Sequence, residues 1–99
     1  MRAPEGISNS FTTQTSTAGV VLLGGQYQLQ AWSAGWNGAH ASVDQLMADG
    51  STWLASLVLA ATANAIALTY LPAGTYRLTV GTATPSSALV LGLQRIPGE

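Results

Sequence analysis

The chain has 99 residues, of which 47% are hydrophobic and only 7% are charged, and its formal net charge is −1. Soluble domains commonly keep about a quarter of their residues charged, so this composition predicts a surface that largely faces other protein chains. Three arginines without any lysine form no basic patch, which argues against binding to nucleic acid or to an anionic membrane. The absence of cysteine excludes disulfides and thiolate chemistry.

The first eighteen residues differ from the rest. Residues 8–18 are rich in serine and threonine and contain one aromatic side chain, Phe11. Such a segment buries little apolar area on its own, so we divide the chain into an extended polar arm, residues 1–18, and a β-sandwich domain, residues 19–99. Because residues 11–15 alternate, the arm could also pair as an edge strand where something supports it.

The remaining chain is typical of short strands separated by turns. Strands are predicted at residues 19–23, 26–33, 41–47, 52–60, 65–70, 75–80 and 88–93. Alternation is clearest in 26–33, where three glutamines share one face and the other face carries Tyr27, Leu29 and Ala31. In 65–70, one face carries Ile66, Leu68 and Tyr70. In 75–80, the inward positions are Tyr76, Leu78 and Val80.

One long uncharged stretch, residues 50–76, raises the question of a membrane span. A spanning helix needs about 20 apolar residues, but this stretch contains polar residues and many alanines, which favour insertion weakly. The apolar residues around 62–64 fit two interpretations: a helix, or a strand followed by a turn and a second strand. The Asp49-Gly50 hairpin turn before this point and the Leu-Pro-Ala-Gly turn after it favour the strands.

The number and spacing of these elements predict the fold class. About seven or eight strands at intervals of roughly 8–12 residues indicate an all-β protein, a single antiparallel β-sandwich with jelly-roll or immunoglobulin-like topology.

Few residues could support catalysis or metal binding. The only histidine, His40, falls in one segment with Ser42 and Asp44, but on a strand such alternate residues lie about 7 Å apart, too far for a direct relay. Asp44 is expected to point outward, and Asp49 is explained by its turn, so the two acids are weak candidates for calcium or for glycoside hydrolysis. We therefore expect no enzymatic activity, no cofactor and no metal site.

The three tryptophans are better functional candidates. Trp53 and Trp32 are expected to pack in the core or between subunits. Trp36 lies in a glycine-rich loop, residues 34–38, where an exposed indole could anchor a protein partner or stack on a sugar ring. Protein contact is the favoured interpretation of the two.

Three segments together resemble the small β-sandwich virion proteins of tailed bacteriophages. They are Gly-Gly-Gln-Tyr-Gln-Leu at 24–29, Asp-Gly-Ser-Thr-Trp at 49–53 and Leu-Pro-Ala-Gly-Thr-Tyr-Arg-Leu-Thr-Val at 71–80. The resemblance covers roughly residues 19–96. It implies a capsid decoration or cement protein on the outer surface of the virion head, often a trimer, without catalytic residues.

We therefore expect a structural virion protein that binds the major capsid protein and stabilises the head, as a homo-oligomer with a trimer favoured. Neither nucleic acid nor a membrane is expected as a partner. The candidate interface residues are Phe11, Trp36, His40 and Arg77. The alternative is a glycan-binding or host-attachment module on the head or tail.

Overall fold

The computed structural model describes residues 6–96, apart from the side chains of Leu57 and Val58, and in this part of the chain it contains nine strands and no helix. The strands are β1 (Gly6–Phe11), β2 (Thr15–Ser16), β3 (Val20–Leu22), β4 (Gly25–Ser33), β5 (His40–Leu46), β6 (Trp53–Ala61), β7 (Ala65–Leu71), β8 (Gly74–Gly81) and β9 (Leu89–Arg95). Every strand pair is antiparallel.

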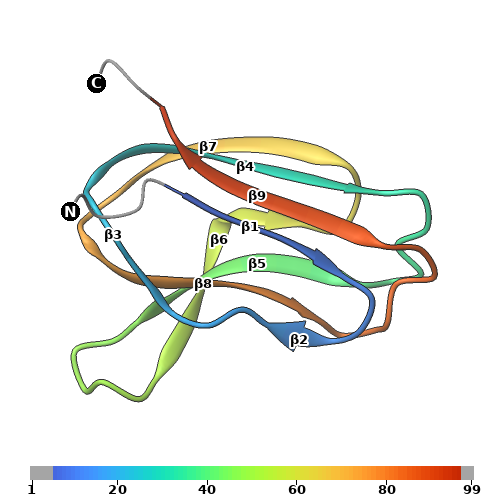
Figure 1. Ribbon diagram of the computed structural model, residues 1–99, viewed down its shortest axis with the longest axis horizontal. Helices are drawn as coiled ribbons and strands as arrows, with labels where there is room; N and C mark the ends of the chain where they lie inside the picture. The colour runs from blue at the N-terminus through green and yellow to red at the C-terminus, as the bar shows by residue number, and fades with distance from the viewer. Residues whose placement is uncertain (1–5, 97–99) are drawn as a thin grey trace.

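Two sheets pack face to face, which confirms the predicted β-sandwich (Figure 1). Sheet A has the strand order β1-β9-β4-β7. Sheet B has the order β2-β8-β5-β6, and β3 pairs with β8 beside β2. The core lies between the sheets and consists of the inward-facing residues of both, such as Tyr27 and Leu29 on β4 and Tyr76 and Leu78 on β8. These four side chains are 0–2% exposed, as their alternation predicted.

The long uncharged stretch folds as two strands, so the strand interpretation of residues 62–64 is confirmed. β6 belongs to sheet B and β7 to sheet A, and the turn between them carries the chain across the sandwich. Within residues 6–96 there is no helix of the length and apolar character that crossing a membrane requires.

The N-terminal segment takes part in both sheets. β1 pairs with β9 in a register that runs from Gly6 opposite Gln94 to Phe11 opposite Leu89, and β2 pairs with β8. The arm therefore pairs with both sheets, but through residues 6–11 and 15–16, whereas residues 12–14 of the alternating segment form a bend. Residues 1–5 of the arm lie outside the described residues.

Two buried tyrosines stabilise two of the places where the chain passes from one sheet to the other. The chain passes from β3 in sheet B to β4 in sheet A, and later from β7 in sheet A to β8 in sheet B. At the first crossing the Tyr27 hydroxyl donates to the Leu23 carbonyl at 2.6 Å, and at the second the Tyr76 hydroxyl donates to the Pro72 carbonyl at 2.7 Å. Each bond closes a turn onto the strand that follows it.

The hairpin between β5 and β6 is built as its sequence predicts. Asp49 accepts hydrogen bonds from the Ser51 amide at 3.0 Å, the Thr52 amide at 2.9 Å and the Thr52 hydroxyl at 2.6 Å. These bonds, the Thr52 hydroxyl first, lower the pKa of Asp49 to about 2. Gly50 has a φ of 77°, a conformation that favours glycine.

Candidate interaction surface

The outward face of sheet A carries large apolar side chains that no other part of residues 6–96 covers. The most exposed of them are Trp32 at 56%, Ile66 at 66%, Leu68 at 55%, Tyr70 at 61% and Val90 at 43%. They come from the three neighbouring strands β4, β7 and β9. A cluster of exposed apolar side chains on one sheet is typical of a contact surface.

The register of the strands explains how these residues come to share a face. On β4 the even-numbered positions point outward, because Tyr27 and Leu29 on the odd-numbered positions fill the core. Gln28 stands opposite Leu68 of β7, and Trp32 stands opposite Val90 of β9. Directly opposite residues point to the same side of a sheet. Because the even-numbered residues of β4 point outward, their partners on β7 and β9 point outward as well.

The residues between the apolar side chains are polar but neutral. The Gln30 amide donates to the Gln28 amide oxygen at 2.9 Å, which links two glutamines along β4. We define the uncharged face as the outward residues of sheet A within the described chain: Gly6, Ser8, Ser10, Gln26, Gln28, Gln30, Trp32, Ile66, Leu68, Tyr70, Val90, Gly92 and Gln94.

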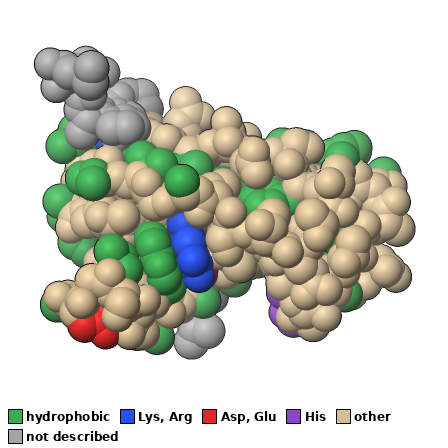
Figure 2. Space-filling view, turned by 60° about the horizontal axis from the view of Figure 1, so that its bottom comes forward, with side chains coloured by type: hydrophobic (Ala, Val, Ile, Leu, Met, Phe, Trp, Pro, Cys, Tyr) green, Lys and Arg blue, Asp and Glu red, His purple; other side chains and the backbone are tan. Residues whose placement is uncertain are grey.

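Charge is sparse on the side of sheet B as well. Figure 2 brings the side with β2 and β8 forward, and blue, red and purple side chains form small separate patches among green and tan ones. At the end of β9, Arg95 stands opposite the inward Tyr27, and its Nε donates to the Gly24 carbonyl at 3.1 Å. It therefore lies at the end of sheet A, at the margin of the uncharged face, where it lines a hollow together with Ser8 and Gln94.

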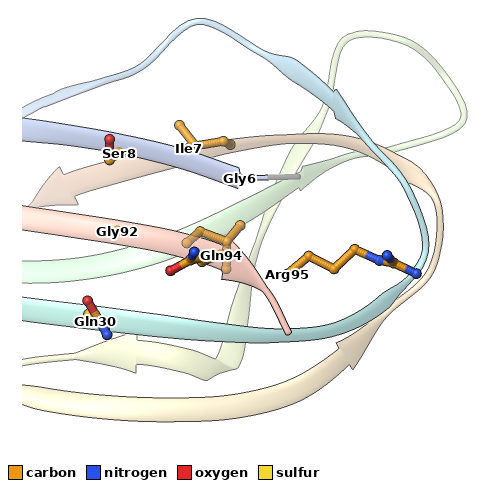
Figure 3. Close-up of a pocket in the computed structure, with 8 residues that line it drawn as sticks. Gly6, Ile7, Ser8, Gln30, Gly92, Gln94 and Arg95 are labelled. Carbon is orange, nitrogen blue, oxygen red and sulfur yellow. The ribbon is translucent and has the colours of Figure 1, made fainter. Parts of the chain in front are cut away.

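A glycine hollows the uncharged face at its centre. Gly92 lies on β9 between Ser8 of β1 and Gln30 of β4, as the register and Figure 3 both show. A Cβ at Gly92 would meet nothing within 4 Å. Two hollows of about 570 Å³ and 660 Å³ meet here, since Ser8, Gln30 and Gly92 line both. Trp32 and Ile66 also line the larger one.

Sheet B contains a buried polar cluster around Asp44. Its carboxylate accepts from Arg77 Nε at 3.0 Å, from the Thr79 hydroxyl at 2.6 Å and from the Ser42 hydroxyl at 3.0 Å. The Arg77 guanidinium lies over the Trp53 ring, 4.4 Å from its centroid. Asp44 lies on the outer face of sheet B as expected, because it stands opposite Arg77 while its neighbour Val43 faces the core, but these neighbours leave it only 5% exposed.

The four candidate interface residues do not form one surface. Phe11 is 1% exposed and packs in the core of its own chain, because it ends β1 on the inward phase opposite Leu89. Arg77 is paired with Asp44, whereas His40 is exposed at the start of β5. Trp36 packs partly against the core. None of these four residues belongs to the uncharged face, which is the better candidate for contact with another protein.

Of the two placements expected for Trp32, the core is wrong and packing between subunits stays a prediction, whereas Trp36 is partly buried and not fully exposed. Trp36 is held by a hydrogen bond from its Nε1 to the Asn64 side-chain oxygen at 2.8 Å, while Trp32 is exposed and is not a core residue. The sequence did contain a signal for Trp32, because it has the same parity as the three outward glutamines of β4.

We predict that Asn64 is the residue that holds the loop of Trp36 in place. Its side-chain oxygen accepts from Trp36 Nε1 and also from the Ser33 amide at 2.9 Å. Asn64→Ala leaves both donors without this acceptor and should lower the free energy of unfolding by about 1–3 kcal/mol. Asn64→Asp keeps an accepting oxygen and is the matched control. Denaturant unfolding followed by tryptophan fluorescence measures both, and equal losses in the two variants would contradict the prediction.

Comparison with known proteins gives no match: no protein-family model matches the chain, and no curated protein or solved structure is significantly similar to it.

Proposed function

We propose that the chain is a capsid decoration protein of a tailed bacteriophage, which binds the major capsid protein on the outside of the head and stabilises the shell. The observation that carries the proposal is the uncharged face, where Trp32 and Val90 stand side by side and exposed. The three turn and strand segments that resemble phage virion proteins supply the virion context. The same resemblance favours a homo-oligomer, with a trimer as the expected state.

The chemistry of the face suits contact with another protein surface. Burial of apolar area contributes about 25 cal/mol per Å² before the costs of association. A stable interface buries about 1,200–2,000 Å² in total. If several copies bind around one cluster of capsid subunits, each copy contributes one such interface to the stability of the cluster. Because Arg95 at its margin is the one charged side chain among the described residues that line its hollows, binding through this face should change little with ionic strength.

Heads that lack the protein provide the direct test of this function. Purified chain should co-sediment with such heads and raise the temperature at which they release DNA. We expect Trp32→Ala to weaken binding at least about tenfold, because a buried aromatic side chain commonly anchors an interface. Gly92→Gln should also weaken binding by filling the hollow, and its Cβ has room within the folded chain.

A matched pair of valines controls for general effects on the surface. Val90→Ala removes apolar area from the uncharged face, whereas Val21→Ala removes the same atoms from β3 of sheet B, where Val21 is 62% exposed. Only Val90→Ala should weaken binding to heads. Failure of the unmodified chain to bind heads, or an equal loss in both valine variants, would refute the proposal.

A glycan-binding or host-attachment role is the second candidate, and one observation favours it. The larger hollow combines the exposed Trp32 ring with the amides of Gln30 and Asn64 and the Ser8 hydroxyl. An indole can stack on the apolar face of a sugar ring while neutral amides bond its hydroxyl groups. Binding on a glycan array that Trp32→Ala abolishes and Trp36→Ala preserves would support this role. An array without any binding would exclude it.

A further inference from the structure

The edge of sheet A at β7 offers a complete set of pairing groups. β7 is the end strand of its sheet and pairs only with β4 among the described strands. In Figure 1 it forms the outer margin of sheet A. Edge strands present unpaired backbone groups that template pairing with another chain, and proteins usually blunt them with lysine, proline or a bulge. Between Ala65 and Leu71 none of these devices is present.

The backbone direction of β7 follows from two hydrogen bonds at the ends of β4. The Ile96 amide donates to the Gln26 carbonyl at 2.8 Å, so the even-numbered backbone groups of β4 face β9. The Ser33 amide donates toward Asn64 at the β7 side, so the odd-numbered groups face β7. Antiparallel strands alternate in this way along their length. The odd-numbered residues of β7 therefore bond to β4, and the even-numbered ones present N–H and C=O groups at the open edge.

The same even-numbered residues carry the exposed apolar side chains. Ile66, Leu68 and Tyr70 are 55–66% exposed on the uncharged face. Beside them, Leu54 of β6 and Tyr70 line a further hollow of about 330 Å³ between the edges of the two sheets. The edge thus combines free pairing groups with apolar side chains and has no charge that would repel an identical strand.

We propose that β7 pairs antiparallel with β7 of a second copy of this chain, which joins the two A sheets into one continuous sheet. Because the even-numbered residues of β7 present the free N–H and C=O groups, the even-numbered residues of one copy must stand opposite the even-numbered residues of the other. The register that uses all three places the two-fold axis at Leu68, with Leu68 opposite Leu68 of the partner subunit and Ile66 opposite Tyr70 of the partner subunit. It forms about six backbone hydrogen bonds and sets aliphatic side chains against aromatic ones, a favourable cross-strand pair.

A second copy fits this edge because the strand is complementary to itself. In a two-fold contact both copies use the same surface. Here that surface is the edge of β7, which is neutral and apolar and therefore suits an identical strand. The contact is separate from the trimer that the resemblance implies, and it does not depend on capsid binding. A strand pair of this length buries less than a standard interface, so we expect a dissociation constant on the order of micromolar.

Sedimentation equilibrium of the full chain across a concentration range tests the pairing. The mass of the unmodified chain should double as its concentration rises, from monomer to dimer or from trimer to hexamer, and Leu68→Lys should weaken this doubling at least about tenfold by placing two like charges side by side. Val90→Lys puts the same charge on the uncharged face away from the edge and should leave the doubling intact. A constant mass throughout, or equal weakening by both variants, would overturn the proposal; the second result would indicate face-to-face contact instead. Circular dichroism confirms that each variant is folded.

Cysteine cross-linking tests the register itself, because the chain has no cysteine of its own. The double variant Ile66→Cys with Tyr70→Cys should form covalent dimers under mild oxidation, since directly opposite strand residues have Cα atoms about 5.5 Å apart, within disulfide reach. Ile66→Cys alone should cross-link poorly, because its partner in this register is Tyr70. Efficient cross-linking of the single variant would refute the register, and failure of the double variant would refute the pairing. An unmodified chain that binds heads but does not pair would refute this inference alone, and one that pairs but does not bind heads would refute the proposed function alone.

Discussion

Asp44→Ala is expected to lower the free energy of unfolding by about 2–3 kcal/mol. The substitution removes one carboxylate that accepts from Arg77, Thr79 and Ser42 at 2.6–3.0 Å. Breaking a fully buried ion pair costs about 3–5 kcal/mol because the remaining charge is left unpaired. The Arg77 side chain is 28% exposed and keeps some hydration, so the expected loss is smaller.

Two further variants separate the loss of the ion pair from the loss of packing. Asp44→Asn keeps an acceptor oxygen for the hydroxyl donors and should cost less than Asp44→Ala. Arg77→Met combined with Asp44→Ala removes both charges, leaves an apolar side chain over Trp53, and should recover part of the loss, as replacement of buried pairs often does. Urea denaturation of the unmodified chain, Asp44→Ala, Arg77→Met alone and the double variant yields the coupling energy between the two positions. A coupling near zero would show that the Asp44–Arg77 pair does not stabilise the sandwich.

Tyr76→Phe is expected to lower the free energy of unfolding by about 1–2 kcal/mol. The side chain is 1% exposed and its hydroxyl donates to the Pro72 carbonyl at 2.7 Å, so the substitution leaves a turn carbonyl without this donor. The ring itself is retained, which keeps the core filled. Tyr27→Phe removes the corresponding bond where the chain passes from β3 to β4 and should produce a loss of similar size. An unchanged unfolding midpoint in either variant would contradict the role assigned to these hydroxyls.

The stability at alkaline pH should also depend on Tyr76. Burial, with smaller contributions from Tyr27 and Tyr70, raises the pKa of Tyr76 above its ordinary value of 10.0. The folded protein therefore holds this proton more tightly than the unfolded chain does. The resulting stability is fully present below pH 10 and is lost as the pH rises through the raised pKa. Tyr76→Phe should flatten this alkaline decline, and a decline equal to that of the unmodified chain would contradict the assignment.

The elements that sequence analysis predicted best are those in which one local pattern decides the outcome. In β4 the inward phase carries Tyr27 and Leu29, the outward phase carries glutamines, and burial follows directly. The Asp49-Gly50 turn needs only a carboxylate that bonds nearby amides and a residue that accepts a positive φ. The two sheets could be anticipated because a strand with one apolar face must cover that face with another layer.

The features that sequence analysis missed depend on contacts between distant segments. The alternation of β7 shows that Ile66 and Leu68 share a face, but only pairing with β4 decides that this face is the outer one. Trp36 is held by Asn64, which is 28 residues away in sequence. Asp44 is buried by side chains of β8, and no local pattern places Arg77 and Thr79 beside it. Long-range register is therefore the information that the sequence pattern lacks.

The position of β9 inside sheet A has a consequence for how the protein is made. β9 lies between β1 and β4, yet the ribosome completes it after the other eight strands. Until it emerges, β1 and the open side of β4 have no partner in their sheet, and the inner faces of the sandwich stay incompletely covered. Strand pairs so far apart in sequence form slowly, and exposed strand edges invite aggregation during that interval. Biosynthesis of this chain should therefore be sensitive to its own translation rate and to the supply of chaperones that shield unpaired strands.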